Sequence, residues 1–433
     1  MNFQRELRIK DSPGAKFREH EAVMDAAEIC SCLAGKTHSV KFSGFTALDE
    51  YLRLPPLPFC WIETDADITV LARLFGNLRF PGLEMADGAV DTAAGPAAVT
   101  CYFRCLDTNE KMQPIFPLLA FTYDWRTKRF QDPLGLYPLL RKIRDKKEFP
   151  QGETGTWPFY RITQTDRFST IMDGALLLAR YGDCAEIAGM VKNTIQQTPA
   201  QGDERPPGPE KQRVFLSCLL VSPSPERGLE LLKHAGFLDE LWPELACYSD
   251  VDHSKEYHPE GNVWDHTLET FRYRKAASSG AFDLRLSLAL LLHDSGKPIS
   301  ASSGNHRFDG HAELGARAAV RFLERLGFSP SLIQDVFYLV KNHMLPAALK
   351  RLPHVKTAEI MASPLFPTLM ELYRCDESSS FKGLDGYYEN SAAYQAYLKN
   401  LKNPYRCADG KKIGKKRLYS IITSDNKFCL FKT

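Results

Sequence analysis

The sequence predicts an α+β fold, in which a mixed-sheet N-terminal part precedes a long all-helical part. Two observations predict this fold. Within residues 1–150, segments rich in β-branched and aromatic residues are separated by Gly and Pro, which is typical of strands and turns. From about residue 160 onward, apolar residues recur at helical spacing. With 44% hydrophobic and 25% charged residues, the composition is that of a globular protein.

Three segments of the N-terminal part predict its strands. The segment WIETDADITVLARLF, residues 61–75, indicates a short strand or loop that runs into a helix. The segment AAVTCYFRCLD, residues 97–107, has the composition of a strand. The segment IFPLLAFTYDWRTKRFQDPLG, residues 115–135, predicts a strand and a turn, with Asp-Pro and Gly as the turn residues.

The helical part begins with DRFSTIMDGALLLARYGDCAEIAGMVKN, residues 166–193, and a Pro/Gly-rich loop follows at Pro199–Glu210. Nearly everything after residue 211 has helical periodicity. At about 150 residues per domain, a chain of 433 residues has room for three domains. We therefore predict a head (1–150), a helical neck and body (151–250), an all-α domain (251–400) and a basic tail (401–433).

The cysteines and the N-terminus predict a cytoplasmic protein with no membrane segment. The eleven cysteines are scattered and include no CxxC pair, which favours free thiols in a reducing compartment. The N-terminal MNFQRELRIK lacks the apolar stretch of a signal peptide, and no apolar run approaches the ~20 residues of a membrane helix. A net charge of +2 restricts any RNA-binding surface to a local patch, and nothing in the sequence fixes the oligomeric state.

The stretch LLLHDSGKP, residues 290–298, places a His-Asp doublet at the end of an apolar helix. Desolvating these two groups is unfavourable unless they have partners, and a divalent metal is a partner that suits imidazole and carboxylate ligands. Further candidate ligands lie in other segments with helical periodicity. These residues are far apart in the sequence, so only a helical bundle would bring them together. Any one histidine alone is more often a surface residue. The full set of candidate ligands is His266, His293, Asp294, His311, His343 and Asp376.

These residues lie in segments that resemble a known family. HPEGNVWDHTL (258–268), LLLHDSGKP and FDGHAELGARAA (308–319) resemble the HD superfamily of metal-dependent phosphohydrolases, and more narrowly the HD domain of bacterial tRNA nucleotidyltransferases, the CCA-adding enzymes. The resemblance covers about residues 251–380. It implies a divalent transition metal (Mn, Fe, Ni, Co or Zn). The implied metal ligands are His266, His293, Asp294 and Asp376.

The same resemblance implies roles around the metal. His311 and His343 would bind a second metal or the phosphate, and Lys297 would neutralise charge on the phosphoryl group. Asp294 would also orient the attacking water. The leading hypothesis is therefore a metal-dependent phosphohydrolase or phosphodiesterase that acts on a nucleotide or on an RNA 3′ end, tRNA included.

The resemblance extends to the N-terminal half, where the segment 213–245 is similar to the neck and body of tRNA nucleotidyltransferases and bacterial poly(A) polymerases. A nucleotidyltransferase-like head needs carboxylates that hold two Mg ions and a glycine turn near the triphosphate. Here other residues stand at these positions, so we predict that the head has lost catalysis and binds only. They are Phe59 and Trp61 for the paired carboxylates, Val99 for the third, Phe45–Thr46 for the glycines, Asp49–Glu50 for Arg-Asp, 113–115 for Arg-Arg-Asp, and Thr170 and Asp173 for the base-reading arginines.

Two alternatives remain open. Asp65 and Asp67 form an Asp-x-Asp, and on a strand both carboxylates would face one side, as the Mg site of an active tRNA nucleotidyltransferase requires. The competing interpretation is that Thr64 and Asp65 cap the helix that follows. The other alternative is a non-catalytic RNA-binding protein, whose basic tail after Pro404 contacts phosphates.

Overall fold

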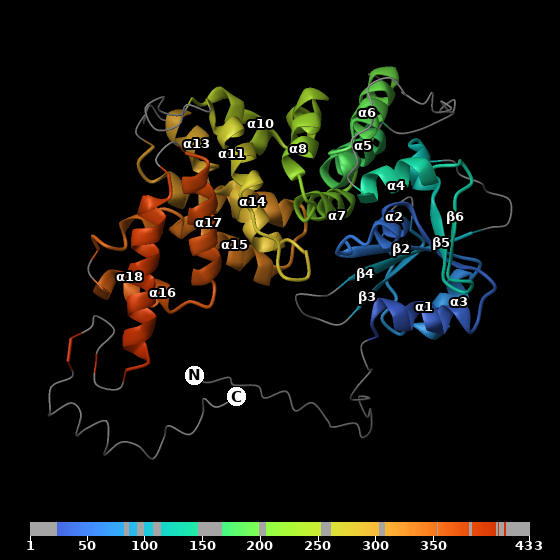
Figure 1. The fold of residues 1–433 in the computed structure, drawn as a ribbon, viewed down its shortest axis with the longest axis horizontal. Coiled ribbons are helices and arrows are strands. Elements are labelled where there is room, and N and C mark those ends of the chain that lie inside the picture. The colour runs from blue at the N-terminus through green and yellow to red at the C-terminus, as the bar shows by residue number, and fades with distance from the viewer. Residues whose placement is uncertain are drawn as a thin grey trace, which may run out of the picture.

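The protein is elongated, with a sheet at one end and helices over the rest of its length (Figure 1). The computed structural model shows the α+β class that the sequence predicts, with the sheet confined to the N-terminal part. Most of the predicted basic tail lies outside the described residues. The structure describes residues 24–81, 86–92, 99–106, 114–145, 167–198, 205–252, 261–302, 308–352, 354–380, 383–403, 406 and 411–412.

The sheet has six strands in the order β3-β4-β2-β1-β5-β6. Strands β2 and β4 pair in parallel, and every other neighbouring pair is antiparallel. Each of the three segments predicted to form strands does contain one. The strands are β1 (Val40–Ser43), β2 (Phe59–Thr64), β3 (Gly88–Asp91), β4 (Thr100–Cys105), β5 (Thr122–Asp124) and β6 (Arg129–Gln131).

Local sequence explains where the helices beside the sheet begin. Asp25 and Glu28 form a capping box at the first helix, in which each side chain accepts a hydrogen bond from the other residue's backbone N–H. The head helices are α1 (Ala26–Ala34), α2 (Gly44–Leu52), α3 (Ile68–Leu74), the 3₁₀ helix η1 (Pro117–Ala120) and α4 (Tyr137–Asp145).

The turn from β1 into α2 differs from the sequence prediction. We placed the glycine turn at Phe45–Thr46, but both residues lie in the first turn of α2. The chain reverses at Gly44, whose φ of 55° is a left-handed conformation that glycine adopts without strain. The strand-to-helix turn is therefore Ser43–Gly44, two residues earlier than predicted.

The remaining helices form two consecutive groups in the chain. Helices α5 and α6 lie next to the sheet-containing part, α7 and α8 lie in the middle of the molecule, and α11 to α18 lie on the side away from the sheet (Figure 1). The 166–193 segment forms two helices, because the first helix ends at Tyr181, before Gly182–Asp183, and the second begins at Ala185. The first group is α5 (Arg167–Tyr181), α6 (Ala185–Gln197), α7 (Pro209–Leu220), α8 (Pro225–His234), α9 (Phe237–Leu241), α10 (Pro243–Ala246) and η2 (Cys247–Asp250).

The second group carries the predicted metal ligands. Its apolar helix α12 is buried along its length from Leu286 to Leu292, as its sequence predicts. No described helix has the length and apolarity that would let it cross a membrane. The group is α11 (Val263–Arg272), α12 (Leu284–Leu292), α13 (Gly296–Ser302), α14 (His311–Arg325), α15 (Pro330–Asn342), η3 (Pro346–Ala348), α16 (His354–Met361), α17 (Phe366–Ser378) and α18 (Asp385–Leu401).

Candidate metal centre

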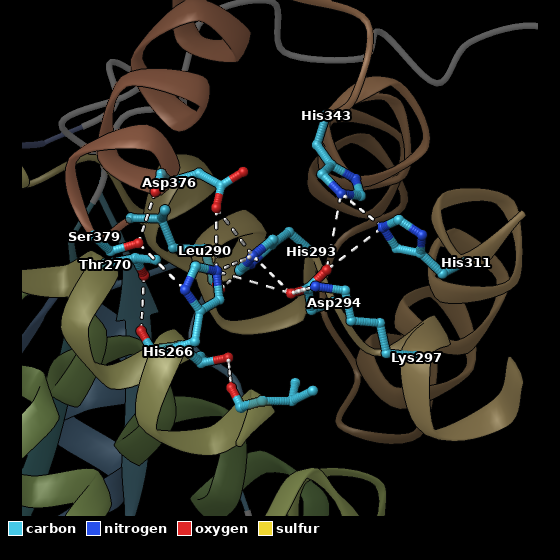
Figure 2. Close-up of polar contacts among 12 residues, drawn as sticks. His266, Thr270, Leu290, His293, Asp294, Lys297, His311, His343, Asp376 and Ser379 are labelled. Carbon is cyan, nitrogen blue, oxygen red and sulfur yellow. Dashed lines mark hydrogen bonds and ion pairs between the residues drawn. The ribbon is translucent and has the colours of Figure 1, made fainter. Parts of the chain in front are cut away.

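The six predicted metal ligands converge on one point between helices (Figure 2). His266 projects from α11, and Asp376 lies near the C-terminal end of α17. His293 and His343 are the residues that cap the C-terminal ends of α12 and α15, and His311 is the first residue of α14. Helix ends thus deliver three of the four imidazoles to one place, as the bundle arrangement predicted.

Backbone carbonyls orient three of these rings. The Nδ1 atoms of His293, His311 and His343 each lie 2.8 Å from the carbonyl oxygen of the residue three positions earlier. Because a carbonyl can only accept, each Nδ1 must carry the proton. In the neutral ring each Nε2 is then a bare lone pair, and these nitrogens point toward the centre of the site.

The Nε2 atoms face one another in two pairs. The distance is 3.3 Å between His266 and His293, and 3.1 Å between His311 and His343. Two ligand nitrogens each ~2.1 Å from a single ion, at angles between 90° and the tetrahedral value, lie about 3.0–3.4 Å apart. Two neutral Nδ1–H rings such as those of His311 and His343 cannot hydrogen-bond to each other through Nε2, so their spacing fits two nitrogens that share a cation.

Asp294 lies between the two histidine pairs and directs one oxygen at each (Figure 2). Its Oδ2 is 3.3 Å from His293 Nε2 and 3.8 Å from His266 Nε2. Its Oδ1 is 3.5 Å from His311 Nε2 and 3.9 Å from His343 Nε2. The site therefore consists of two groups of potential ligands that share this carboxylate.

Asp376 and Lys297 complete the charges of the site. Asp376 Oδ1 lies 3.1 Å from His266 Nε2 and 4.0 Å from His293 Nε2, so the first group has four potential ligands. Lys297 Nζ lies 2.6 Å from Asp294 Oδ2. The ammonium group is thus held beside the shared carboxylate, with its side chain 11% exposed.

Electrostatics keep these groups in the protonation states that metal binding requires. Burial alone would raise the pKa of Asp294, but His293 and Lys297 outweigh it and hold the pKa well below its usual range. The pKa of Asp376 is also lowered, because contacts with His266 outweigh burial. Burial lowers the pKa of His311, and burial together with His293 lowers the pKa of His343 to about 4. The acids are ionised and these two imidazoles are neutral at pH 7.

The depressed pKa of His343 predicts a pH dependence of stability in the metal-free protein. The unfolded chain takes up a proton near pH 6.5, whereas the folded chain does so only near pH 4, so stability is lost as the pH falls through this window. Between pH 7 and pH 5 the loss should be about 2 kcal/mol. Urea unfolding at both pH values measures it, and a His343→Gln variant should show a smaller pH dependence. An equal dependence in both proteins would contradict the prediction.

Close packing of backbone explains why a glycine stands at position 296 of the HDSGKP stretch. A Cβ atom at this position would lie 1.9 Å from the carbonyl oxygen of His311, and one at Gly315 would lie 2.9 Å from the backbone nitrogen of Gly296. The two glycines therefore let α13 and α14 approach closely, which holds His311 near the His-Asp doublet. The sequence reasoning named this glycine without a structural reason.

One contact of the site was not predicted. Ser379, the residue that caps the C-terminal end of α17, places its Oγ 3.3 Å from Nδ1 of His266. A separation of 113 residues divides the two, and a serine just after a helix is ordinary in sequence, so no sequence signal distinguishes it.

Aromatic residues occupy the sheet positions that we assigned to the catalytic carboxylates of the head. Phe59 and Trp61 alternate on β2, and Tyr102 lies opposite Trp61 on β4. The ring centroids of Trp61 and Tyr102 are 4.8 Å apart, and those of Phe59 and Tyr102 are 5.8 Å apart. Thr46 Oγ1 accepts a hydrogen bond from the backbone N–H of Trp61. Stacked rings therefore cover this part of the sheet.

The structure also differs from the prediction at Asp65 and Asp67, which the alternative interpretation placed on a strand. Strand β2 ends at Thr64, so Asp65 and Asp67 lie after it and share no strand face. Asp65 accepts hydrogen bonds from the backbone N–H groups of His38 and Ser39. Asp67 caps α3 by accepting from Val70 N–H at 2.8 Å. The capping prediction was right in kind but named the wrong residues, Thr64 and Asp65, because the residue directly before the helix at Ile68 is Asp67.

The other predicted head positions give no carboxylate cluster either. Asp49 is buried in an ion pair with Arg180, and Thr170 is fully buried. Burial raises the pKa of Asp173 to about 7, although Lys211 opposes the shift. Val99 precedes β4, and Gln113 lies outside the described residues. Among the described residues, the potential metal-binding groups of three or more side chains are those around Asp294.

Comparison with known proteins finds relatives of the part of the chain that carries this site. The HD domain family model matches residues 263–372. A "Multifunctional CCA protein" of Halorhodospira halophila is 33% identical over 42% of this chain and 44% of its own length. A "CC-adding tRNA nucleotidyltransferase" of Thermus thermophilus is 32% identical over 45% of each. This chain therefore carries an HD domain and is similar over part of its length to tRNA nucleotidyltransferases, the CCA-adding enzymes.

The resemblance stated from the sequence is thus confirmed at the level of the family. The match spans less than half the length of both curated relatives. A solved CCA-adding enzyme with ATP aligns over 89% of this chain and 85% of its own, with a TM-score of 0.38 and 12% identity. A "Bifunctional uridylyltransferase/uridylyl-removing enzyme" of Ruegeria pomeroyi is 31% identical over 31% of this chain and 16% of its own length.

Proposed function

We propose that this protein is a metal-dependent phosphohydrolase or phosphodiesterase that acts on a nucleotide or on an RNA 3′ end. One observation carries the proposal: two pairs of facing Nε2 lone pairs lie on either side of one buried, ionised carboxylate. Without a metal ion, this arrangement brings imidazole nitrogens together around a buried carboxylate that only Lys297 neutralises, which is unfavourable.

The donor set indicates which residues would hold metal. His266, His293, Asp294 and Asp376 would bind one ion, and His311, His343 and the other oxygen of Asp294 would bind a second ion or leave room for a phosphate. Imidazole and carboxylate donors suit Mn, Fe, Co, Ni or Zn. A bound metal would lower the pKa of water and polarise a phosphoryl oxygen, which is the chemistry that phosphoester hydrolysis needs.

The protein supplies orientation and charge around that chemistry. Lys297 donates to Asp294 and lies at the partly exposed side of the site, where its ammonium would neutralise a phosphoryl oxygen of the substrate. Asp294, ionised at neutral pH, would orient the attacking water through a hydrogen bond. Two relatives support this substrate class, because one is named for CC addition to tRNA and the other for uridylyl removal.

The test combines elemental analysis of the purified protein with a hydrolysis screen. The screen covers 2′,3′-cyclic nucleotides, nucleoside monophosphates and bis(p-nitrophenyl) phosphate, each with added Mn²⁺ and Co²⁺. We expect bound transition metal and turnover of at least one phosphate ester. A protein that binds no metal and hydrolyses none of these compounds would contradict the proposal and favour the non-catalytic RNA-binding alternative.

We further infer that the head does not transfer nucleotides and serves to bind RNA or a nucleotide. In support, aromatic rings cover the face of β2 and β4, and both Asp65 and Asp67 are engaged by backbone N–H groups. Nucleotidyl transfer requires carboxylates that share two Mg ions about 3.5–4 Å apart.

This inference predicts no incorporation of CTP or ATP into a tRNA that lacks its 3′ end. The assay uses radiolabelled nucleotides, Mg²⁺ and an active CCA-adding enzyme as the positive control. Incorporation by the wild-type chain that an Asp65→Asn/Asp67→Asn variant loses would instead establish the alternative of an active tRNA nucleotidyltransferase.

A further inference from the structure

Ser379 differs from the other groups that orient the histidine rings of the metal centre. His293 and His343 each use a carbonyl of their own helix, and those carbonyls stay in place as long as the helix does. His266 lies inside α11, where the carbonyl three residues earlier, that of Val263, already accepts from Thr267 Oγ1 at 2.7 Å. Its Nδ1 lies instead beside a hydroxyl group from α17.

The direction of the Ser379 hydrogen bond follows from its second contact. Ser379 Oγ lies 2.7 Å from the carbonyl oxygen of Asp376 and must donate its proton there, because a carbonyl only accepts. Its oxygen then has lone pairs left, so it accepts from Nδ1–H of His266 at 3.3 Å. Ser379 is buried, with 8% of the residue exposed, which keeps water from replacing its hydroxyl readily.

Resting on the proposed function, we infer that Ser379 is a positioning residue that holds the proton of His266 on Nδ1 and so keeps Nε2 available as a ligand. Because the same hydroxyl also bonds to the backbone of Asp376, it connects two ligands of the first metal group across α11 and α17. Partners of this kind fix the tautomer and the ring orientation of a metal-binding histidine, and their loss typically weakens metal binding 10–100-fold.

The chain supplies matched controls on both sides. Ser378 Oγ donates to the carbonyl of Arg374 at 2.6 Å, and Ser380 Oγ donates to the carbonyl of Glu377 at 2.8 Å. All three serines therefore make the same kind of bond to the end of α17, but of the three it is Ser379 whose hydroxyl also contacts His266 of the metal centre. A purely helix-capping role would predict similar effects from all three.

The experiment measures Co²⁺ and Mn²⁺ affinity of the full chain by isothermal titration, with Co²⁺ absorption as a second readout. We expect Ser379→Ala to raise the Kd of the tighter site 10–100-fold, and Ser379→Thr, Ser378→Ala and Ser380→Ala to stay near the wild type. Thermal unfolding of the metal-free variants shows whether each still folds. Nitrogen NMR of ¹⁵N-histidine protein should show a mixture of tautomers at one histidine in Ser379→Ala alone.

The outcomes separate this inference from the proposed function. A wild-type chain that binds no metal overturns both. A wild-type chain that binds metal while Ser379→Ala binds it equally well, or while all three alanine variants weaken equally, overturns the role of Ser379 and leaves the proposed function standing.

Discussion

An Asp294→Ala variant is expected to lose stably bound metal and to hydrolyse phosphate esters at least about a thousandfold more slowly than the wild type. The reason is geometric, because the two oxygens of Asp294 face the two histidine pairs separately and no other carboxylate contacts both within the described site. Its removal would also leave Lys297 Nζ without the carboxylate that lies 2.6 Å away. The ammonium group of Lys297 would then repel the metal ion at the place where the carboxylate of Asp294 attracts it in the wild type.

Asp283 provides a control on the same helix. It caps the N-terminal end of α12 by accepting from Arg285 N–H, whereas Asp294 lies just beyond the other end of the helix. An Asp283→Ala variant should lose about 1 kcal/mol of stability and keep its metal and activity. Elemental analysis, hydrolysis rates and urea unfolding of both variants complete the comparison. Full activity in Asp294→Ala would rule out the site as the hydrolytic centre.

The ligands could be predicted from the sequence because histidines and acids at helix ends are rare enough to be informative as a set. The contacts that each ligand makes could not be predicted from the sequence, since they depend on the directions of the imidazole rings and carboxylate oxygens. Which oxygen of Asp294 faces which histidine pair, and the pairing of His266 with a serine 113 residues away, follow from the crossing of helices in space. Periodicity predicts helices but not how they pack against one another.

In the head, the sequence predicted the kinds of elements but not the residues at which they begin and end. The strands and helices were predicted in kind, but the turn at Gly44 and the cap at Asp67 were each displaced by two residues. A capping acid and a metal-binding acid have the same sequence pattern after a strand, and only the position at which β2 ends distinguishes them. Asp65 binds the backbone that enters β1, a contact that depends on how β1 and β2 pair.

Asp49 supports the second large prediction, an effect on stability. We assigned this residue to the position of an arginine in the family's Arg-Asp pair, but the structure uses it to join the head to the neck. Asp49 Oδ2 pairs with Arg180 Nη2 at 2.8 Å, and Oδ1 accepts from Arg180 Nε at 2.9 Å and from Tyr181 Oη at 2.7 Å. The Asp49 and Arg180 side chains are 5% and 2% exposed, so α2 and α5 are connected by a buried, two-pronged ion pair.

An Asp49→Ala variant should therefore lose about 3–5 kcal/mol of unfolding free energy. The loss comes from the partner left behind, because the buried guanidinium of Arg180 would keep its hydrogen bond to the carbonyl of Pro55 but would lose its counter-charge. Urea unfolding followed by tryptophan fluorescence measures the change. Glu50→Ala, one residue along the same helix but exposed, should change stability by less than about 0.5 kcal/mol.

A double variant tests whether the Asp49–Arg180 ion pair adds net stability to the fold, or whether the single variant is unstable only because one buried charge is left without its partner. Replacing both partners, as Asp49→Leu/Arg180→Met, removes the charges together and fills the space with apolar side chains. Such replacements of buried ion pairs are often neutral or stabilising, so we expect the double variant to regain most of the stability lost in Asp49→Ala. If it stays as unstable as the single variant, the ion pair itself supplies net stability. In either case the hydrolytic activity that we propose for the candidate metal centre, which lies at the far end of the molecule from the sheet, should be unchanged once the protein is folded (Figure 1).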